Sequence, residues 1–185
     1  DVDRYKIGSA DVTNLLMLEK IVETKKDVIL STGMINVKEL DVAVNLFEKN
    51  GINFSLLYCV SKYPSTSKDI NLNFIEILKN KYKVKVGFSD HSGLIWPSIA
   101  AASRGAEILE FHAVFDKKMF GPDSSASLKI KDIAKLTKAL EVVEDCCNET
   151  DTKEYEGYLI GLKEVFKRSL CVNRDIKKGE IINLA

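Results

Sequence analysis

The sequence has little of what several specialised protein classes require. Its four cysteines form neither a Cys-x-x-Cys pair nor a dense disulfide framework, so we expect reduced thiols and a cytoplasmic protein. The 27 basic and 27 acidic side chains cancel and are interspersed. This balance predicts no nucleic-acid partner and no membrane partner, because both need a basic face.

Long apolar runs and export signals are also missing. No apolar run approaches the roughly 18 residues that cross a bilayer. The opening residues, DVDRYKIGSA, lack the basic and apolar regions of a signal peptide. What the chain does have is 45% apolar residues in a length that suits one ordinary domain. We therefore expect a packed core and a small-molecule partner.

Short apolar runs alternate with stretches of helical periodicity. Five runs, each followed by a turn signal, are RYKIGS, DVILST, FSLLYCVS, VKVGFSDHS and EILEFHAV. The stretches with apolar residues three and four apart are 12–23, 37–49, 72–82, 97–104 and 130–145. Asn36 with Glu39 predicts a capping box at the start of the second stretch. The alternation is typical of an α/β protein with a parallel sheet.

Two architectures fit five βα units. One is a complete, doubly wound open sheet of the flavodoxin type. The other is a partial (β/α)8 TIM barrel, a fold that needs about 250 residues. The length favours a partial barrel. After Asp145 the chain turns polar, and residues 168–185 predict two strands around a turn, the beginning of a small β-rich domain.

Polar side chains follow the predicted strands, where parallel α/β folds bind ligands. Both histidines, His91 and His112, lie at the ends of strands that are neighbours in the sequence. Strand alternation gives Glu110 and His112 the same face. The residues left to face helices are Leu109, Phe111 and Ala113. Each histidine alone is as well explained by a core or capping role. Together they predict a site for one divalent metal, and two ligands with open positions suit Mn²⁺ or Mg²⁺.

A second candidate site is the turn at Ser31, Thr32 and Gly33. Backbone N–H groups between a strand and a helix can hold an anion, and Lys6 at the end of the preceding strand can add positive charge. A simple turn with a helix cap, and a solvated lysine, explain the same residues. Phosphate binding is thus a hypothesis here.

Six motifs in order resemble the sialic acid synthase family, which comprises N-acetylneuraminate, legionaminic acid and pseudaminic acid synthases. They are YKIGSAD, VILSTGM, LLYCVSKYPS, VGFSDHSG, EFHAVFDKKMFGPDSSASL and RSLCVNRDIKKGEII. The resemblance implies that residues 1–150 form the later part of the barrel. Residues 151–167 would be a linker, and residues 168–185 the start of an antifreeze-like (SAF) domain. It also implies a homodimer for the full-length protein.

The same resemblance implies an activity. Family members condense phosphoenolpyruvate with an N-acylated mannose-type amino sugar to a nine-carbon 2-keto sugar acid and release phosphate. By position, the metal ligands are His91 and His112, and the catalytic carboxylates are Glu110 and Asp11. Tyr63, Asp123 and Asp11 correspond to sugar contacts. The residues corresponding to phosphoenolpyruvate contacts are Lys6, Ser9, Ser31, Ser61 and Ser89.

Departures from the family pattern bear on the sugar. Asp11 stands where the family usually has Glu, and Ser61 where relatives often carry Asn or Thr. These changes favour a legionaminic-type sugar over N-acetylneuraminate. Because the first three barrel strands have no counterpart, we expect the 185-residue chain to be inactive alone. Two alternatives remain: a Schiff-base aldolase that uses Lys85 or Lys6, and a fragment that binds phosphoenolpyruvate without catalysis.

Overall fold

The computed structural model describes residues 2–147, 152–169 and 171–182. Contacts divide the chain into two units, Asp1–Cys147 and Asn148–Ala185. The first unit contains the sheet and five α-helices, and the second contains one helix. Each unit is described separately below.

A parallel sheet of five strands forms the centre of the first unit. The strands are β1 (Arg4–Ile7), β2 (Asp27–Ser31), β3 (Phe54–Cys59), β4 (Val86–Asp90) and β5 (Leu109–Phe111). Their order in the sheet is the same as their order in the chain. A doubly wound sheet reverses its strand order at a switch point, whereas a barrel adds each strand beside the last. The flavodoxin-type alternative is therefore wrong, and the partial barrel is confirmed.

The sheet is strongly curved. In a flat sheet, the edge strands β1 and β5 would lie four spacings apart, about 19 Å. Instead, Lys6 Nζ on β1 lies 3.2 Å from Glu110 Oε2 on β5. Only a sheet that bends towards this pair brings the two side chains together, so the five strands form an arc of a barrel.

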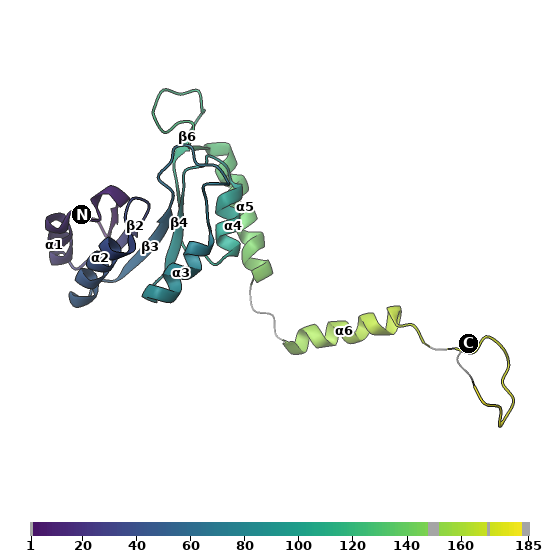
Figure 1. Cartoon of the computed structure of the whole chain (residues 1–185). Helices are drawn as coiled ribbons and strands as arrows, with labels where there is room; N and C mark the ends of the chain where they lie inside the picture. Colours follow the sequence, from purple (N-terminus) through teal and green to yellow (C-terminus); the bar gives the residue numbers. More distant parts are fainter. Residues whose placement is uncertain (1, 148–151, 170, 183–185) are drawn as a thin grey trace. The chain divides into compact units, whose positions relative to one another are not determined.

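The helices follow the strands as the periodicity predicts. They are α1 (Leu15–Glu23), α2 (Val37–Lys49), α3 (Asn73–Tyr82), α4 (Trp96–Ser103) and α5 (Ile130–Cys147), with a 3₁₀ turn, η1, at Ser9–Asp11. They are arranged along the sheet from α1 and α2 on the β1 side to α4 and α5 on the β5 side (Figure 1). The predicted capping box of Asn36 and Glu39 is present at the start of α2.

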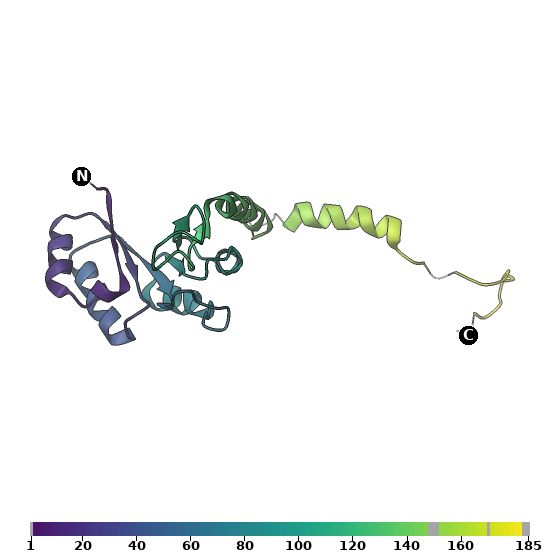
Figure 2. The ribbon, with the colours of Figure 1, turned by 90° about the horizontal axis from the view of Figure 1, so that it is seen from above.

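Strand register separates the two faces of the sheet. Leu30, Leu56 and Phe88 lie on one face and belong to the core, together with buried residues of the helices such as Phe47. The opposite face, where Lys6 and Glu110 meet, is the inner face of the arc. Figure 2 shows the ribbon from above. Helices thus cover the outer face only, and the inner face is left for a site.

Two short strands follow β5. They are β6 (Ala113–Val114) and β7 (Leu128–Lys129), which pair in parallel, and β7 leads directly into α5. The segment between them projects beyond β6 (Figure 1). Ala113 is exposed in β6 rather than packed against helices, so that expectation is wrong. The reason is that β5 ends at Phe111 and the chain leaves the five-stranded sheet before Ala113.

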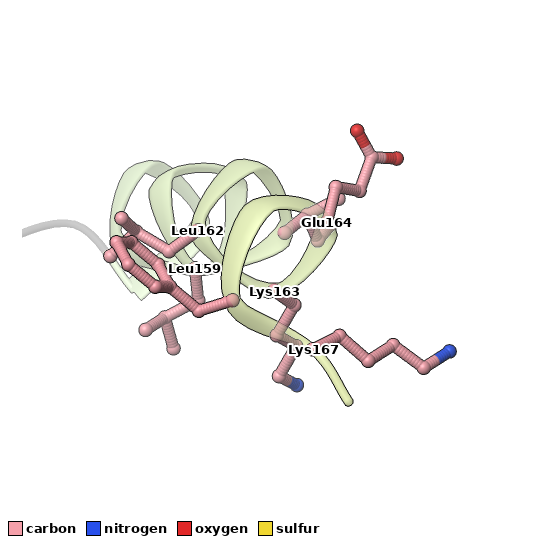
Figure 3. A pocket seen from close by; sticks show the side chains of 7 residues that line it. Leu159, Leu162, Lys163, Glu164 and Lys167 are labelled. Carbon is pink, nitrogen blue, oxygen red and sulfur yellow. The ribbon is translucent and has the colours of Figure 1, made fainter. Parts of the chain in front are cut away.

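The second unit contains α6 (Thr152–Phe166). Figure 3 shows Leu159 and Leu162 on one side of this helix and Glu164 pointing away from them. The helix occupies most of the expected linker, whose residue 151 lies outside the described residues. Within residues 168–169 and 171–182 the chain forms a turn, closed by the Glu180 amide on the Lys177 carbonyl, but no strand.

The strands expected in this last segment are therefore not formed in its described part, and residues 170 and 183–185 lie outside it. A two-stranded hairpin is marginal without a sheet or helix to pack against. The start of an antifreeze-like domain stays a prediction. None of the helices in the described ranges is long and apolar enough to cross a membrane.

Candidate functional site

Register places the predicted site residues on one face of the sheet. Lys6 pairs with Ile29, and Ser31 pairs with Leu57, which in turn pairs with Gly87. Ser89 pairs with Cys59 on one side and Glu110 on the other. Because directly paired residues share a face, the inner-face residues at the carboxyl ends of the strands are Lys6, Ser31, Cys59, Ser89 and Glu110.

Glu110 connects three strands through its carboxylate. Ser89 Oγ donates to Glu110 Oε1 at 2.8 Å, and Lys6 Nζ approaches Oε2 at 3.2 Å. The lysine and the glutamate side chains are each about one-third exposed, at 35% and 37%. A cation, a hydroxyl and a carboxylate thus meet at a point that solvent and a small ligand can reach.

His91 is buried and has a defined tautomer. Its Nδ1 lies 2.8 Å from the Val60 carbonyl oxygen, which can only accept, so Nδ1 carries the proton and donates. In the neutral ring Nε2 is then an acceptor, and the Tyr63 hydroxyl lies 3.1 Å from it. Burial raises the pKa of Tyr63, with further contributions from Cys59, Asp123 and Glu110, so the phenol remains protonated at neutral pH.

His112 completes the group. Its ring centroid lies 5.4 Å from that of His91 and 5.9 Å from that of Tyr63. No hydrogen bond is made by the His112 ring to any of the residues that the structure describes, and its backbone carbonyl accepts from Leu128. The expectation that the two histidines lie together at the ends of adjacent strands is confirmed. We call the set Lys6, Ser89, His91, Glu110 and His112 the strand-end site.

The donor set of this site fits a divalent metal in part. Two imidazoles approach each other, and the unprotonated Nε2 of His91 has the lone pair that a metal needs. Among the residues that the structure describes, no group of three His, Cys, Asp or Glu side chains is arranged to hold a metal. A metal here would have His91 and His112 as its two side-chain ligands, and both this site and its occupation by Mn²⁺ or Mg²⁺ remain predictions.

The predicted phosphate turn lies beside this site. Ser9 Oγ and Ser61 Oγ are 3.4 Å apart, and Thr32 Oγ1 donates to the Leu57 carbonyl at 3.1 Å. A Cβ atom at Gly33 would lie 2.6 Å from Ser61 Oγ. The turn after β2 thus packs closely against the end of β3, and Ser31 is buried at its start.

The two aspartates differ in their surroundings. Asp11 is exposed in η1, where its backbone amide bonds to the Gly8 carbonyl. Asp123 is partly buried, and its charge contributes to the raised pKa of Tyr63. The structure therefore brings Asp123 near the strand-end site. It shows no comparable interaction of the Asp11 side chain with that site within residues 2–147.

Two further strand-end residues have other roles. Asp90 accepts from the Ser92 amide at 2.8 Å and from Ser98 Oγ at 3.0 Å, so it organises the turn into α4. Lys85, the candidate aldolase nucleophile, precedes β4 and lines a hollow at the amino end of the sheet. Lys85 therefore lies at the opposite end of the sheet from the strand-end site, because β4 begins after it and runs away from it.

Sequence reasoning missed three contacts. Cys59 is buried under the site, with Sγ 3.9 Å from Ser61 Oγ and from His91 Nδ1, and burial raises the pKa of its thiol. Val60 fixes the His91 tautomer through its backbone, which no residue pattern reveals. Lys117 Nζ donates to the Gly93 carbonyl at 2.8 Å and ties the segment between β6 and β7 to the turn after β4.

A model of the NeuB family matches residues 1–152. An N,N'-diacetyllegionaminic acid synthase of Campylobacter jejuni is 37% identical over 182 residues, which cover 97% of this chain and 54% of that protein. The N-acetylneuraminate-9-phosphate synthase of Homo sapiens is 29% identical over 185 residues, covering 100% of this chain and 51% of that protein. The chain thus spans about half the length of the curated relatives it matches.

Solved structures agree in fold. An N-acetylneuraminic acid (sialic acid) synthetase from Leptospira borgpetersenii, in complex with citrate, has a TM-score of 0.80 and 35% identity, covering 91% of this chain and 60% of that chain. A truncated 3-deoxy-D-arabino-heptulosonate 7-phosphate synthase from Thermotoga maritima has a TM-score of 0.68 at 17% identity, covering 78% and 59%. The latter shares the fold alone.

Proposed function

Because the chain belongs to the NeuB family, we propose that it carries the strand-end site of a synthase that joins phosphoenolpyruvate to an N-acylated mannose-type sugar. The product would be a nine-carbon 2-keto sugar acid of the sialic or legionaminic type, with release of phosphate. The observation that carries the proposal is the meeting of Lys6, Glu110 and Ser89 beside two imidazoles at the carboxyl end of a barrel sheet.

The anion contacts come from this chain's own side chains. Lys6 supplies the positive charge, and the hydroxyls of Ser61 and Ser89 supply donors for the phosphate and carboxylate groups of phosphoenolpyruvate. Glu110 now neutralises Lys6 at 3.2 Å. We expect an incoming phosphate or carboxylate to compete with Glu110 for Lys6, which would release Glu110 for a role in proton transfer.

Carbon–carbon bond formation requires an electrophilic aldehyde. A divalent metal at His91 and His112, Mn²⁺ or Mg²⁺, would supply Lewis-acid polarisation of that carbonyl. The methylene carbon of phosphoenolpyruvate would bond to the aldehyde carbon, whose oxygen takes up a proton and becomes a hydroxyl. Water would add to the neighbouring carbon that carries the phosphate oxygen and give up a proton, and phosphate would leave that carbon by C–O cleavage, which forms the keto group. Tyr63, whose ring lies beside His112, and Asp123, whose charge acts on Tyr63, would contact the sugar.

The sugar and the setting are part of the same proposal. The legionaminic acid synthase relative supports a legionaminic-type acceptor. The cysteines among the described residues, Cys59, Cys146, Cys147 and Cys171, are free, as expected of a cytoplasmic protein. Because the chain spans about half of its relatives, we propose that it does not complete a turnover alone and that the full-length protein is a homodimer.

Calorimetric titration with Mn²⁺ tests the metal site. We expect binding by the 185-residue chain, and its loss in the His91→Ala, His112→Ala double variant. A matched control replaces the exposed Cys146 and Cys147 by alanine, because adjacent thiols can bind metals adventitiously. Equal binding by the chain and the histidine double variant would contradict the proposal, as would loss of binding in the cysteine control.

The aldolase alternative receives less support. Lys85 lies at the wrong end of the sheet, and Lys6 is paired with a carboxylate rather than placed among apolar side chains that would activate an amine. Borohydride reduction in the presence of pyruvate distinguishes the two functions. A covalent pyruvyl adduct on Lys6 would favour the aldolase, and its absence together with Mn²⁺ binding would favour the synthase.

A further inference from the structure

Tyr63 lies directly against the two histidines. Its ring stacks on the His91 ring, with centroids 4.1 Å apart and an interplanar angle of 29°, and its hydroxyl is 3.1 Å from His91 Nε2. Its ring centroid is 5.9 Å from that of His112. The side chain is nonetheless 47% exposed. Tyr63 can therefore turn towards solvent without leaving a cavity in the core.

The direction of this hydrogen bond follows from its neighbours. In the neutral imidazole, His91 Nδ1 donates to the Val60 carbonyl, so Nε2 accepts. Ser89 Oγ lies 3.4 Å from Nε2, but its proton is directed to the Glu110 carboxylate at 2.8 Å. The Tyr63 hydroxyl is therefore the donor to Nε2, and it occupies the lone pair with which an imidazole coordinates a metal.

We propose that Tyr63 is a positioning residue that guards His91: its hydroxyl holds Nε2 while no cation is bound, and it must leave that nitrogen before His91 can act as a ligand. This inference rests on the metal site of the proposed function. The stacked phenol and the Val60 carbonyl together hold the His91 ring in place while no cation is bound. Once released, the hydroxyl is free to bind the sugar beside the metal.

The substitution Tyr63→Phe isolates the hydroxyl. It keeps the stacked ring and removes only the donor that competes for Nε2. Because a neutral hydrogen bond has a modest net value, we expect Mn²⁺ to bind the variant roughly threefold to tenfold more tightly than the unaltered chain. A matched control is Tyr82→Phe at the end of α3. It removes a hydroxyl that donates to Asp41 Oδ1 at 2.8 Å and does not contact the strand-end site.

Two measurements test the inference. The first is the Mn²⁺ dissociation constant of the unaltered chain, Tyr63→Phe and Tyr82→Phe. The second is the ¹⁵N NMR spectrum of histidine-labelled, metal-free protein, which contains signals from only two imidazoles. We expect the Nε2 resonance of His91 to shift in Tyr63→Phe and to stay unchanged in Tyr82→Phe, since only the former removes a donor to that nitrogen.

The outcomes separate the inference from the proposed function. Tighter Mn²⁺ binding by Tyr63→Phe, with the shifted Nε2 resonance, supports the guard. If the unaltered chain binds Mn²⁺ and Tyr63→Phe binds it equally or more weakly, the guard is wrong and the metal site stands. If neither protein binds Mn²⁺, the metal site fails and the guard fails with it. An unchanged Nε2 resonance in Tyr63→Phe would also overturn the guard.

Discussion

The two ends of the five-stranded sheet are both polar, yet their side chains are organised differently. At the amino end, Arg4 pairs with Asp27 at 3.3 Å and Lys79 pairs with Glu107 at 2.9 Å. These are separate, partly exposed pairs, and each contributes about 0–1 kcal/mol to stability. Arg4, Asp27 and Glu107 line a hollow of about 390 Å³, and no histidine is among its lining residues. Within residues 2–147, the ion pairs at this end are not joined to one another or to a histidine.

At the carboxyl end the polar groups depend on one another. Glu110 accepts a hydrogen bond from Ser89 and forms an ion pair with Lys6. His91 is held between the Val60 carbonyl and Tyr63. Hydroxyls, a cation, a carboxylate and two imidazoles are thus positioned by strands β1, β3, β4 and β5. Charge at a strand terminus is therefore weak evidence of a site, and connection between strands is better evidence.

The largest expected effect distinguishes two lysines at opposite ends of the sheet. Lys6→Met removes the cation at the carboxyl end, and we expect the affinity for phosphoenolpyruvate to fall roughly tenfold to a hundredfold, as for other charged hydrogen bonds. Lys85→Met is the matched control at the amino end, and we expect no change. Calorimetric titration with phosphoenolpyruvate measures both.

A loss of affinity in Lys85→Met equal to that in Lys6→Met would break the comparison between the two ends. It would place the anion site in the amino-end hollow. Thermal unfolding of both variants provides a check on folding, because Lys6 also pairs with Glu110.

The sequence predicts which residues occur at the ends of strands, but not how far the sheet bends. Alternation predicts a shared face for Glu110 and His112, and the pairing of Ser89 with Glu110 in register comes from the structure alone. The Lys6–Glu110 contact depends on the accumulated curvature of five strands, which is a long-range property. Lys85 lies near the start of the run VKVGFSDHS, just before β4, and so at the amino end of that strand.

A smaller effect is expected from crowding at the carboxyl end. In Gly33→Ala, the new methyl would lie 2.6 Å from Ser61 Oγ, 2.8 Å from the Cys59 sulfur and 3.1 Å from the Cys59 Cβ. Relief requires the turn to move away from β3, at a cost of about 1–3 kcal/mol in the free energy of unfolding. Urea denaturation measures this change.

Gly8→Ala is the matched control for this prediction. Gly8 has φ of −68°, and its added methyl would meet only Asp11 Oδ2, at an ordinary 3.7 Å. We expect a change near zero. Equal destabilisation by both substitutions would show that the close packing of the Gly33 turn against Ser61 is unimportant.

The first unit forms the strands that its sequence predicts, whereas the described part of the second unit does not. One of the six family-like motifs, RSLCVNRDIKKGEII, lies in residues 168–182, yet no strand forms in the described part of that segment. Strands β1 to β5 gain partners on both sides or pack against helices, whereas a lone hairpin has neither. Sequence resemblance therefore predicts structure only where the packing partners are present.

The smallest effect concerns the loop that carries Tyr63 at the carboxyl end. Asp69 accepts from Lys62 Nζ at 2.8 Å, from the Thr66 amide at 2.8 Å and from Thr66 Oγ1 at 2.6 Å. These contacts lower the pKa of Asp69 from 3.8 to about 2, and the hydrogen bond from Lys62 has the largest effect. A lowered pKa means that the contribution to stability is complete above about pH 4 and is lost as the pH falls towards 2.

We expect the unaltered chain to be more stable than Asp69→Asn above about pH 4, and the difference between them to vanish as the pH approaches 2. Urea unfolding of the two proteins across this range measures the difference. Asp27→Asn at the amino end is the comparison variant, since Asp27 pairs with a single exposed arginine. A difference for Asp69→Asn that does not vary with pH would show that the Asp69 carboxylate does not hold the Tyr63 loop through its charge. The connected arrangement at the carboxyl end would then stop at the strand-end site and would not extend into the loop beside it.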